Sequence, residues 1–226
     1  SVHKKVVFVT TSSRSPYVEK FGESPKSSQL AKHIAQKLKE RDVEVDVIDA
    51  SKLTIHNCLG CVSEIHGNNC GAKESLLKDS EKNPNGKLRC WASHDFEDDE
   101  LWKISKELFE SDCVIFFSSV RWGAANMFYQ KLIERLNWIN NRYIPYGEPN
   151  IIKNTTSGFI CVGQHQYADE ICQRQYENHD YYGFKANKDL YWFWNAEDTG
   201  YDDETLQGYR ESYPDFFEEF HIKVKS

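Results

Sequence analysis

No stretch of the sequence is apolar for long enough to cross a membrane. The longest apolar runs, residues 6–9 and 114–117, have the length of single β-strands, whereas a spanning helix needs about 20 apolar residues. The first ten residues also lack the apolar stretch and the small-residue cleavage site of a secretory signal. These absences predict a cytoplasmic chain that has no membrane partner.

Basic residues are neither in excess nor clustered. The 226 residues include 28 Lys and Arg against 35 Asp and Glu, which gives a formal net charge of −7. Binding to nucleic-acid phosphates requires clustered Lys and Arg. The composition therefore predicts that nucleic acid is not a partner.

Three common ligand-binding motifs are also missing. The sequence contains no G-x-x-x-x-G-K-[ST] phosphate loop, and no G-x-G-x-x-G fingerprint follows its first apolar run. Cys58 and Cys61 form a C-x-x-C pair, but a zinc ribbon would need a second such pair. A nucleoside triphosphatase, a Rossmann dehydrogenase and a zinc ribbon are thus disfavoured.

Seven cysteines are an odd number in a chain too long to need disulfide staples, so we expect reduced thiols. We predict no metal site. If a metal or an iron–sulfur cluster were bound, Cys58 and Cys61 would be its candidate ligands. A turn with buried thiols and a redox-active pair are the alternatives. Two further cysteines lie in apolar runs and are expected in the core, Cys113 and Cys161.

Short apolar runs alternate with segments of helical periodicity along the chain. Continuous apolar runs predict strands at 6–9, 113–117, 159–162 and 190–194, and the apolar residues Val43, Val45, Val47 and Ile48 predict another strand at 43–48. Apolar residues at helical spacing predict helices at 27–40, 97–108, 128–139, 168–176 and 204–220. This alternation predicts an α/β fold in one domain over residues 1–226, with a parallel sheet and helices on both faces.

Two segments depart from this alternation. Residues 51–95 carry four of the cysteines and little periodicity, and we interpret them as a long excursion with one short helix near 73–79. Asp98 and Asp99 precede a helical segment. An acidic metal site is one interpretation of this pair, but a solvated helix N-terminus explains it better.

Ligands of open parallel sheets bind beyond the carboxyl ends of the strands. The loop after the first predicted strand offers the hydroxyl of Ser12 and the guanidinium of Arg14, and it ends at Ser27 and Ser28, where a helix begins. Free backbone N–H groups make a helix N-terminus an anion site. A serine-rich turn with a capped helix is the alternative.

Several short motifs follow one another along the first 165 residues. They read TSSR at 11–14, SSQLA at 27–31, CLGC at 58–61, SVRWG at 119–123 and QKLIER at 130–135. In order and spacing they resemble the NAD(P)H-dependent FMN reductase family of flavodoxin-like flavoproteins, which shows G-S-x-R, a Ser/Thr cap before L-A, C-x-G-C, P-V-Y-W-G and K-x-x-I-D-R. The sequence departs from the family at Ser119 for Pro, Arg121 for Tyr and Gln130 for Lys, and its first loop is longer.

The resemblance implies a flavodoxin-like three-layer sandwich with a five-stranded parallel sheet in the order 2-1-3-4-5. It also implies an FMN cofactor, NADPH or NADH as the electron donor, and a homodimer. A hydride would pass from nicotinamide to flavin N5 and on to a small-molecule acceptor, a quinone, flavin, azo or nitro compound, by a ping-pong route.

The residues that match the family's motifs are the expected FMN ligands. Those around the phosphate would be Ser12, Arg14, Ser27, Ser28 and Gln29. Those along the isoalloxazine ring and its far side would be Ser118, Ser119, Val120, Arg121, Trp122, Gly123 and Gly163.

Arg121 and His165 are possible modulators of a chemistry that the flavin itself carries. A cation beside the ring would favour its reduced, anionic form, although Arg121 could equally point to solvent. His165 and Tyr167 follow the fourth predicted strand, from which a side chain could reach the flavin or the substrate. Trp122 is the candidate for covering the ring or stacking on a substrate.

Two other functions remain open. An acidic flavodoxin-type electron carrier would suit the net charge, but it would not suit Arg121 or the additional loops. A flavodoxin-like binding module that has lost FMN is compatible with Ser119 in place of the family's proline.

Overall fold

Parallel strand pairing organises the protein, whose computed structural model describes residues 4–17, 20, 24–163 and 167–195. The five long strands lie side by side in the order β2-β1-β3-β5-β6, and every pairing among them is parallel. Their bounds are Lys5–Thr10 (β1), Glu44–Asp49 (β2), Cys113–Arg121 (β3), Thr156–Gly163 (β5) and Lys185–Asn195 (β6).

Counted along the chain, the five long strands have the predicted order 2-1-3-4-5. The prediction of only five strands was wrong, because a two-residue strand, β4 (Ala124–Ala125), pairs antiparallel with β3. β3 also continues past residue 117. Ser118 and Ser119 pair with β5, and the last two residues of β3 pair with β4.

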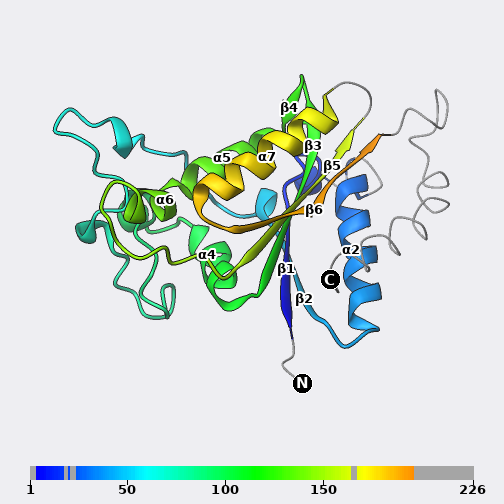
Figure 1. Cartoon of the computed structure of the whole chain (residues 1–226), viewed down its shortest axis with the longest axis horizontal. Coiled ribbons are helices and arrows are strands. Elements are labelled where there is room, and N and C mark those ends of the chain that lie inside the picture. The colour runs from blue at the N-terminus through cyan, green and yellow to red at the C-terminus, as the bar shows by residue number, and fades with distance from the viewer. Residues whose placement is uncertain (1–3, 18–19, 21–23, 164–166, 196–226) are drawn as a thin grey trace.

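Helices cover both faces of the sheet. In Figure 1, α2 (Lys26–Lys39) lies on one side, while α4 (Leu101–Glu110), α5 (Met127–Arg135) and α7 (Ala168–Tyr182) lie on the other. α6 (Asn137–Tyr143) follows directly on α5. The predicted flavodoxin-like layering is therefore confirmed for the described residues. The helix predicted at 204–220 lies outside them.

The sheet has a core on each face because its central strands alternate apolar side chains between the two sides. In β1, Val7 and Val9 pack with residues of α4 and α5, whereas Phe8 packs with residues of α2. The Phe8 and Phe117 rings meet at 5.1 Å between centroids. Cys113 and Cys161 are buried in these cores, as predicted.

Three predicted helices differ from the observed ones. The helix predicted at 97–108 begins only at Leu101. The helix predicted at 128–139 is divided at Leu136, whose φ of −90° and ψ of −2° end α5. The helix predicted near 73–79 is a single 3₁₀ turn, η4 (Lys73–Ser75).

Residues 51–95 form the irregular segment at the cyan and teal end of Figure 1, beside α6. Its regular structure is limited to α3 (Trp91–Asp95), η4 and η3 (Cys61–Ser63), with η2 (Ala50–Lys52) at its start. Side chains of α6 hold this segment in place by hydrogen bonds to its backbone carbonyls. Asn141 donates to the carbonyl of Cys70 at 2.7 Å, and Arg142 donates to that of Lys87 at 2.7 Å. Within the described residues, no helix combines the length and apolar character needed to cross a membrane.

Candidate functional site

Three loops leave the carboxyl ends of adjacent strands at one edge of the sheet. β1 pairs with β3, where Thr10 lies opposite Phe117, and β3 pairs with β5, where Ser119 lies opposite Val162. The loops after β1, β3 and β5 therefore start beside one another. This edge lies toward the top of Figure 1, where β4 is found.

The loop after β1 ends at the open N-terminus of α2. The residue before the helix is Pro25, which makes no side-chain cap, and the first-turn residues Ser27 and Ser28 are only 3% and 4% exposed. The Ser28 Oγ has no hydrogen-bond partner among the described residues. A buried hydroxyl without a partner costs about 1–3 kcal/mol, and first-turn amides have no acceptor within their own helix. The start of α2 therefore offers unused donors to an anion.

Other predicted phosphate ligands shape the same loop. Ser12 is 3% exposed, and its Oγ accepts a bond of 3.4 Å from the backbone N–H of Arg14. The Gln29 side chain donates to the carbonyl of Ser24 at 2.6 Å, which fixes the loop where it enters α2. In the structure, Gln29 holds the loop through this bond.

The loop after β3 is a hairpin that turns at Trp122 and Gly123. Both residues have positive φ, 50° and 72°, as the turn between β3 and β4 requires. Ser118 is fully buried, whereas Arg121 is exposed, with no ion pair to any described residue. Trp122 is completely exposed, so in the isolated chain it covers nothing.

Asn126 joins the first two loops, and the sequence analysis did not identify it. Its side-chain amide donates to Thr11 Oγ1 at 3.3 Å and to Ser119 Oγ at 3.1 Å. Its Oδ1 accepts the N–H of Tyr129 at 3.0 Å and so caps α5. Asn is a favoured N-cap, which would have marked a helix start but not the contact with Thr11.

The end of β5 packs against the hairpin. A Cβ on Gly163 would lie 2.5 Å from Val120 Cγ2, so only glycine fits there. Tyr167, which precedes α7 with a φ of 75°, lies against Gly123; a Cβ on Gly123 would be 3.2 Å from Tyr167 Cδ2. His165 lies outside the described residues.

These observations fit a phosphorylated flavin whose phosphate would lie at the N-terminus of α2. The Ser28 hydroxyl, which no described residue bonds, and the first-turn amides of α2 are donors, as phosphate oxygens require. The hairpin of residues 118–126 stands next to this loop and is joined to it by Asn126. The predicted ligands thus come from loops that the fold brings together.

Asp99 corrects the interpretation of a solvated helix start. Both Asp99 and Arg135 side chains are fully buried and are joined by two bonds of 2.7 and 2.9 Å. Arg135 also donates to the His56 carbonyl at 2.7 Å and to Ser93 Oγ at 3.0 Å. Burial alone would raise the pKa of Asp99, but the bonds from Arg135 outweigh it and lower that pKa. Asp99 therefore anchors residues 51–95 to α5.

The cysteines of residues 51–95 are all free thiols. Burial raises the pKa of Cys61 to about 11 and that of Cys70 to about 12, so both stay protonated at neutral pH. Asn137 and Arg135 each donate to a sulfur at 3.4 Å, of Cys70 and Cys90 respectively. In the described part of the chain, no three His, Cys, Asp or Glu side chains gather closely enough to hold a metal ion.

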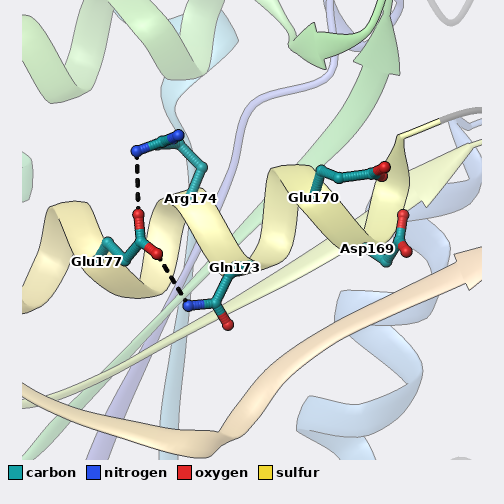
Figure 2. A pocket seen from close by; sticks show the side chains of 5 residues that line it. All are labelled: Asp169, Glu170, Gln173, Arg174 and Glu177. Carbon is teal, nitrogen blue, oxygen red and sulfur yellow. Dashed lines mark hydrogen bonds and ion pairs between the residues drawn. The ribbon is translucent and has the colours of Figure 1, made fainter.

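A depression of about 440 Å³ runs along α7. Figure 2 shows that its lining side chains all come from this one helix. Arg174 and Gln173 both bond Glu177 at 3.0 Å, and Arg174 is 71% exposed. The two remaining lining residues, Asp169 and Glu170, are exposed in the first turn of the same helix, so this is ordinary helix surface.

No protein-family model matches the sequence, and comparison with curated proteins finds no match. Solved structures do match. RosB, with bound 8-demethyl-8-formylriboflavin-5'-phosphate, is 15% identical, with a TM-score of 0.62 over 96% of this chain and 75% of RosB. Azoreductase from Bacillus anthracis strain Sterne is 15% identical, with a TM-score of 0.59 over 99% and 100% of the two chains.

A third match is the general stress protein 14 of Treponema denticola in complex with FMN. It is 8% identical, with a TM-score of 0.53 over 97% of this chain and 99% of that one. At such identities the likeness establishes the fold, which this chain shares with proteins whose structures hold phosphorylated flavins.

Proposed function

We propose that the protein is an FMN-dependent NAD(P)H oxidoreductase that delivers electrons to a small-molecule acceptor. The observation that carries the proposal is the buried Ser28 hydroxyl at the N-terminus of α2, which has no hydrogen-bond partner among the described residues and lies at the same sheet edge as the hairpin of residues 118–126. The shared fold with RosB and the FMN-bound stress protein supports it.

The chain's own residues would bind and orient the cofactor. Ser12, Arg14 and the first turn of α2 would bind the phosphate, and the backbone of residues 118–123 would lie along the ring. Position 163 beside Val120 has room only for glycine, and Gly163 would therefore keep the far side of the hairpin close to β5. Bound FMN would supply the redox chemistry by taking a hydride from nicotinamide and passing the electrons on.

No acid or base from the protein is needed for hydride transfer, so position and charge are what the chain contributes. Arg121 is exposed at the hairpin, with no ion pair to a described residue. A cation at this place would attract negative charge on a reduced ring or a phosphate of the nicotinamide donor. The acceptor would be a quinone, flavin, azo or nitro compound, reached by a ping-pong route.

Titration of the purified protein with FMN tests the proposal. We expect saturable quenching of flavin fluorescence, and bleaching of the bound flavin when NADPH or NADH is added under anaerobic conditions. Ser28→Ala removes the hydroxyl and should raise the FMN Kd by about tenfold, because a hydrogen bond to a charged group contributes about 1.5–3 kcal/mol.

Two results would contradict the proposal in different ways. If the wild-type protein did not bind FMN, the cofactor assignment would fail, and a binding module without flavin would be favoured. If it bound FMN that neither nicotinamide could reduce, an electron carrier would replace the oxidoreductase.

A further inference from the structure

Asn126 occupies a position between two loops that are far apart in the sequence. It is 1% exposed and directly follows β4. Thr11 lies 115 residues earlier in the loop after β1, and Ser119 lies in the extended part of β3. One side chain therefore contacts both the proposed phosphate loop and the proposed ring loop.

The donor and the acceptor of each hydrogen bond around Asn126 can be assigned. Its Nδ2 donates to Thr11 Oγ1 and Ser119 Oγ, and its backbone N–H donates to Ser118 Oγ at 3.2 Å. Thr11 passes the chain of bonds on by donating to the Phe117 carbonyl at 2.7 Å. Because an amide has only two side-chain protons, the two bonds use both, and the donors of this buried group are satisfied.

We propose that Asn126 is a positioning residue that sets the distance between the phosphate-binding and ring-binding loops of the FMN site. This inference rests on the proposed function. The phosphate and ring of FMN are parts of one molecule, so both loops must be in place together for either set of contacts to form without strain. A cross-link held in the free protein lowers the ordering cost of binding.

The burial of the cross-link makes its effect larger than that of a surface bond. Water cannot replace the lost partners easily at a side chain that is 1% exposed, and hydrogen bonds are stronger in such surroundings. Removing the amide would leave Thr11 joined to β3 only through its bond to the Phe117 carbonyl, and Ser119 would lose its side-chain link to the loop after β1. The ring would then meet a displaced hairpin, which changes its electrostatic surroundings as well as its affinity.

Asn126→Ser separates this role from the capping of α5. Serine is a favoured N-cap, so it can still accept the N–H of Tyr129, but it has no amide to reach Thr11 and Ser119. A matched control is Asn83→Ser in the irregular segment. Asn83 is 6% exposed and donates to the carbonyls of Leu77 and Leu88 at 2.8 and 3.3 Å, away from both loops.

The experiment measures the FMN Kd by fluorescence quenching, the midpoint potential of bound FMN, and the thermal unfolding of the free protein. For Asn126→Ser we expect a Kd raised by about tenfold, which corresponds to two lost hydrogen bonds of ordinary strength, and a shifted midpoint potential. Asn83→Ser should lower the thermal stability at least as much while leaving the Kd and potential at wild-type values.

A second arm combines Asn126→Ser with Thr11→Val, which keeps the shape of the side chain but removes the hydroxyl. If both substitutions act by breaking the same link between Asn126 and Thr11, the FMN Kd of the double variant should not exceed the higher Kd of the two single variants. Fully additive losses would contradict that link.

Other outcomes separate this inference from the function on which it rests. A wild-type protein that binds FMN, together with an Asn126→Ser variant of unchanged Kd and potential, would overturn the positioning role and leave the proposed function standing. An Asn83→Ser variant that lost FMN affinity as strongly would reduce the effect of Asn126 to general stability and would also overturn the role. A wild-type protein that does not bind FMN would overturn both.

Discussion

His179 is a fully buried histidine in the middle of a polar network between α7 and the sheet. Its Nε2 meets the hydroxyl of Tyr129 at 2.8 Å, and its Nδ1 meets that of Tyr191 at 2.8 Å. The Tyr129 hydroxyl donates its proton to Gln175 Oε1 at 2.7 Å. Its oxygen must therefore accept a hydrogen bond from a protonated Nε2 of His179. Nδ1 then accepts from Tyr191, whose oxygen accepts in turn from Ser157 at 2.8 Å. Every polar group of this network has a partner when the ring is neutral, the form that burial favours.

Acid should therefore destabilise the fold through His179. Burial lowers its pKa from an ordinary 6.5 to about 3, so below pH 6.5 the unfolded chain takes up a proton that the folded protein does not. Stability contributed by the neutral ring is fully present above pH 6.5 and is lost as the pH falls from there toward 3, by up to about 1.4 kcal/mol per pH unit. Urea unfolding at pH 7 and pH 5 measures this slope.

His179→Gln provides the comparison, because glutamine can hydrogen-bond but does not titrate. We expect it to be less stable at pH 7 by about 1–3 kcal/mol, since one of the two tyrosine hydroxyls loses its partner. Its loss of stability between pH 7 and pH 5 should be smaller than that of the wild type. Equal losses would show that His179 is not responsible.

At the scale of the elements, the buried pair of Asp99 and Arg135 fixes the irregular segment to α5. Asp99→Asn leaves the guanidinium of Arg135 buried without its counter-charge, and we expect a loss of about 3–5 kcal/mol, measured by urea unfolding. The neighbouring Asp98→Asn is the control. Asp98 is 69% exposed at its side chain and bonds only His56 among the described residues, so its loss should stay within about 1 kcal/mol. Similar losses for the two variants would contradict the anchoring role.

The hairpin between β3 and β4 gives a second prediction at this scale. Gly123→Ala places a side chain at a φ of 72° and against Tyr167. The strain alone costs about 1–2 kcal/mol, and the Tyr167 ring must shift slightly to make room for the added methyl group. Because the hairpin is the proposed ring loop, we expect the FMN Kd to rise by about fivefold, or about 1 kcal/mol.

Gly147→Ala controls for backbone strain. Gly147 has a φ of 66°, but a Cβ there meets nothing within 4 Å. The Gly147→Ala variant should be less stable than the wild type but bind FMN with the same Kd. An unchanged affinity in Gly123→Ala would show that the position of Tyr167 is irrelevant to binding.

The elements also show what a sequence can and cannot predict. Four of the five long strands follow from continuous apolar runs, since a strand buried on both faces carries few polar side chains. β2 follows instead from Val43, Val45, Val47 and Ile48, between which polar residues stand. β4 is missed because two alanines have no pattern of their own; pairing with the end of β3 makes them a strand. Asp99 was misread because acidic residues before a helix usually face water, and its partner Arg135 lies 36 residues away.

At the scale of the whole molecule, the same limit applies to the candidate site. Hydroxyls before a helix are a local signal, and so the loop from Ser12 to Ser28 was identified from the sequence. Asn126 has its decisive contact with Thr11, which no local pattern can reveal. The roles of the predicted ligands stay predictions until FMN binding is measured, and so does the homodimer. Size-exclusion chromatography with light scattering can test the latter.

The loops of the candidate site follow three strands, β1, β3 and β5, which lie side by side in the sheet but are separated along the chain by β2 and β4. A partly formed sheet would therefore present at most one or two of these loops in place. Uptake of a yellow flavin would therefore be a late event in biogenesis, and colour would distinguish finished molecules from folding intermediates. By mass action the coenzyme would also protect finished molecules against unfolding, so cellular riboflavin supply would influence how much of the protein accumulates.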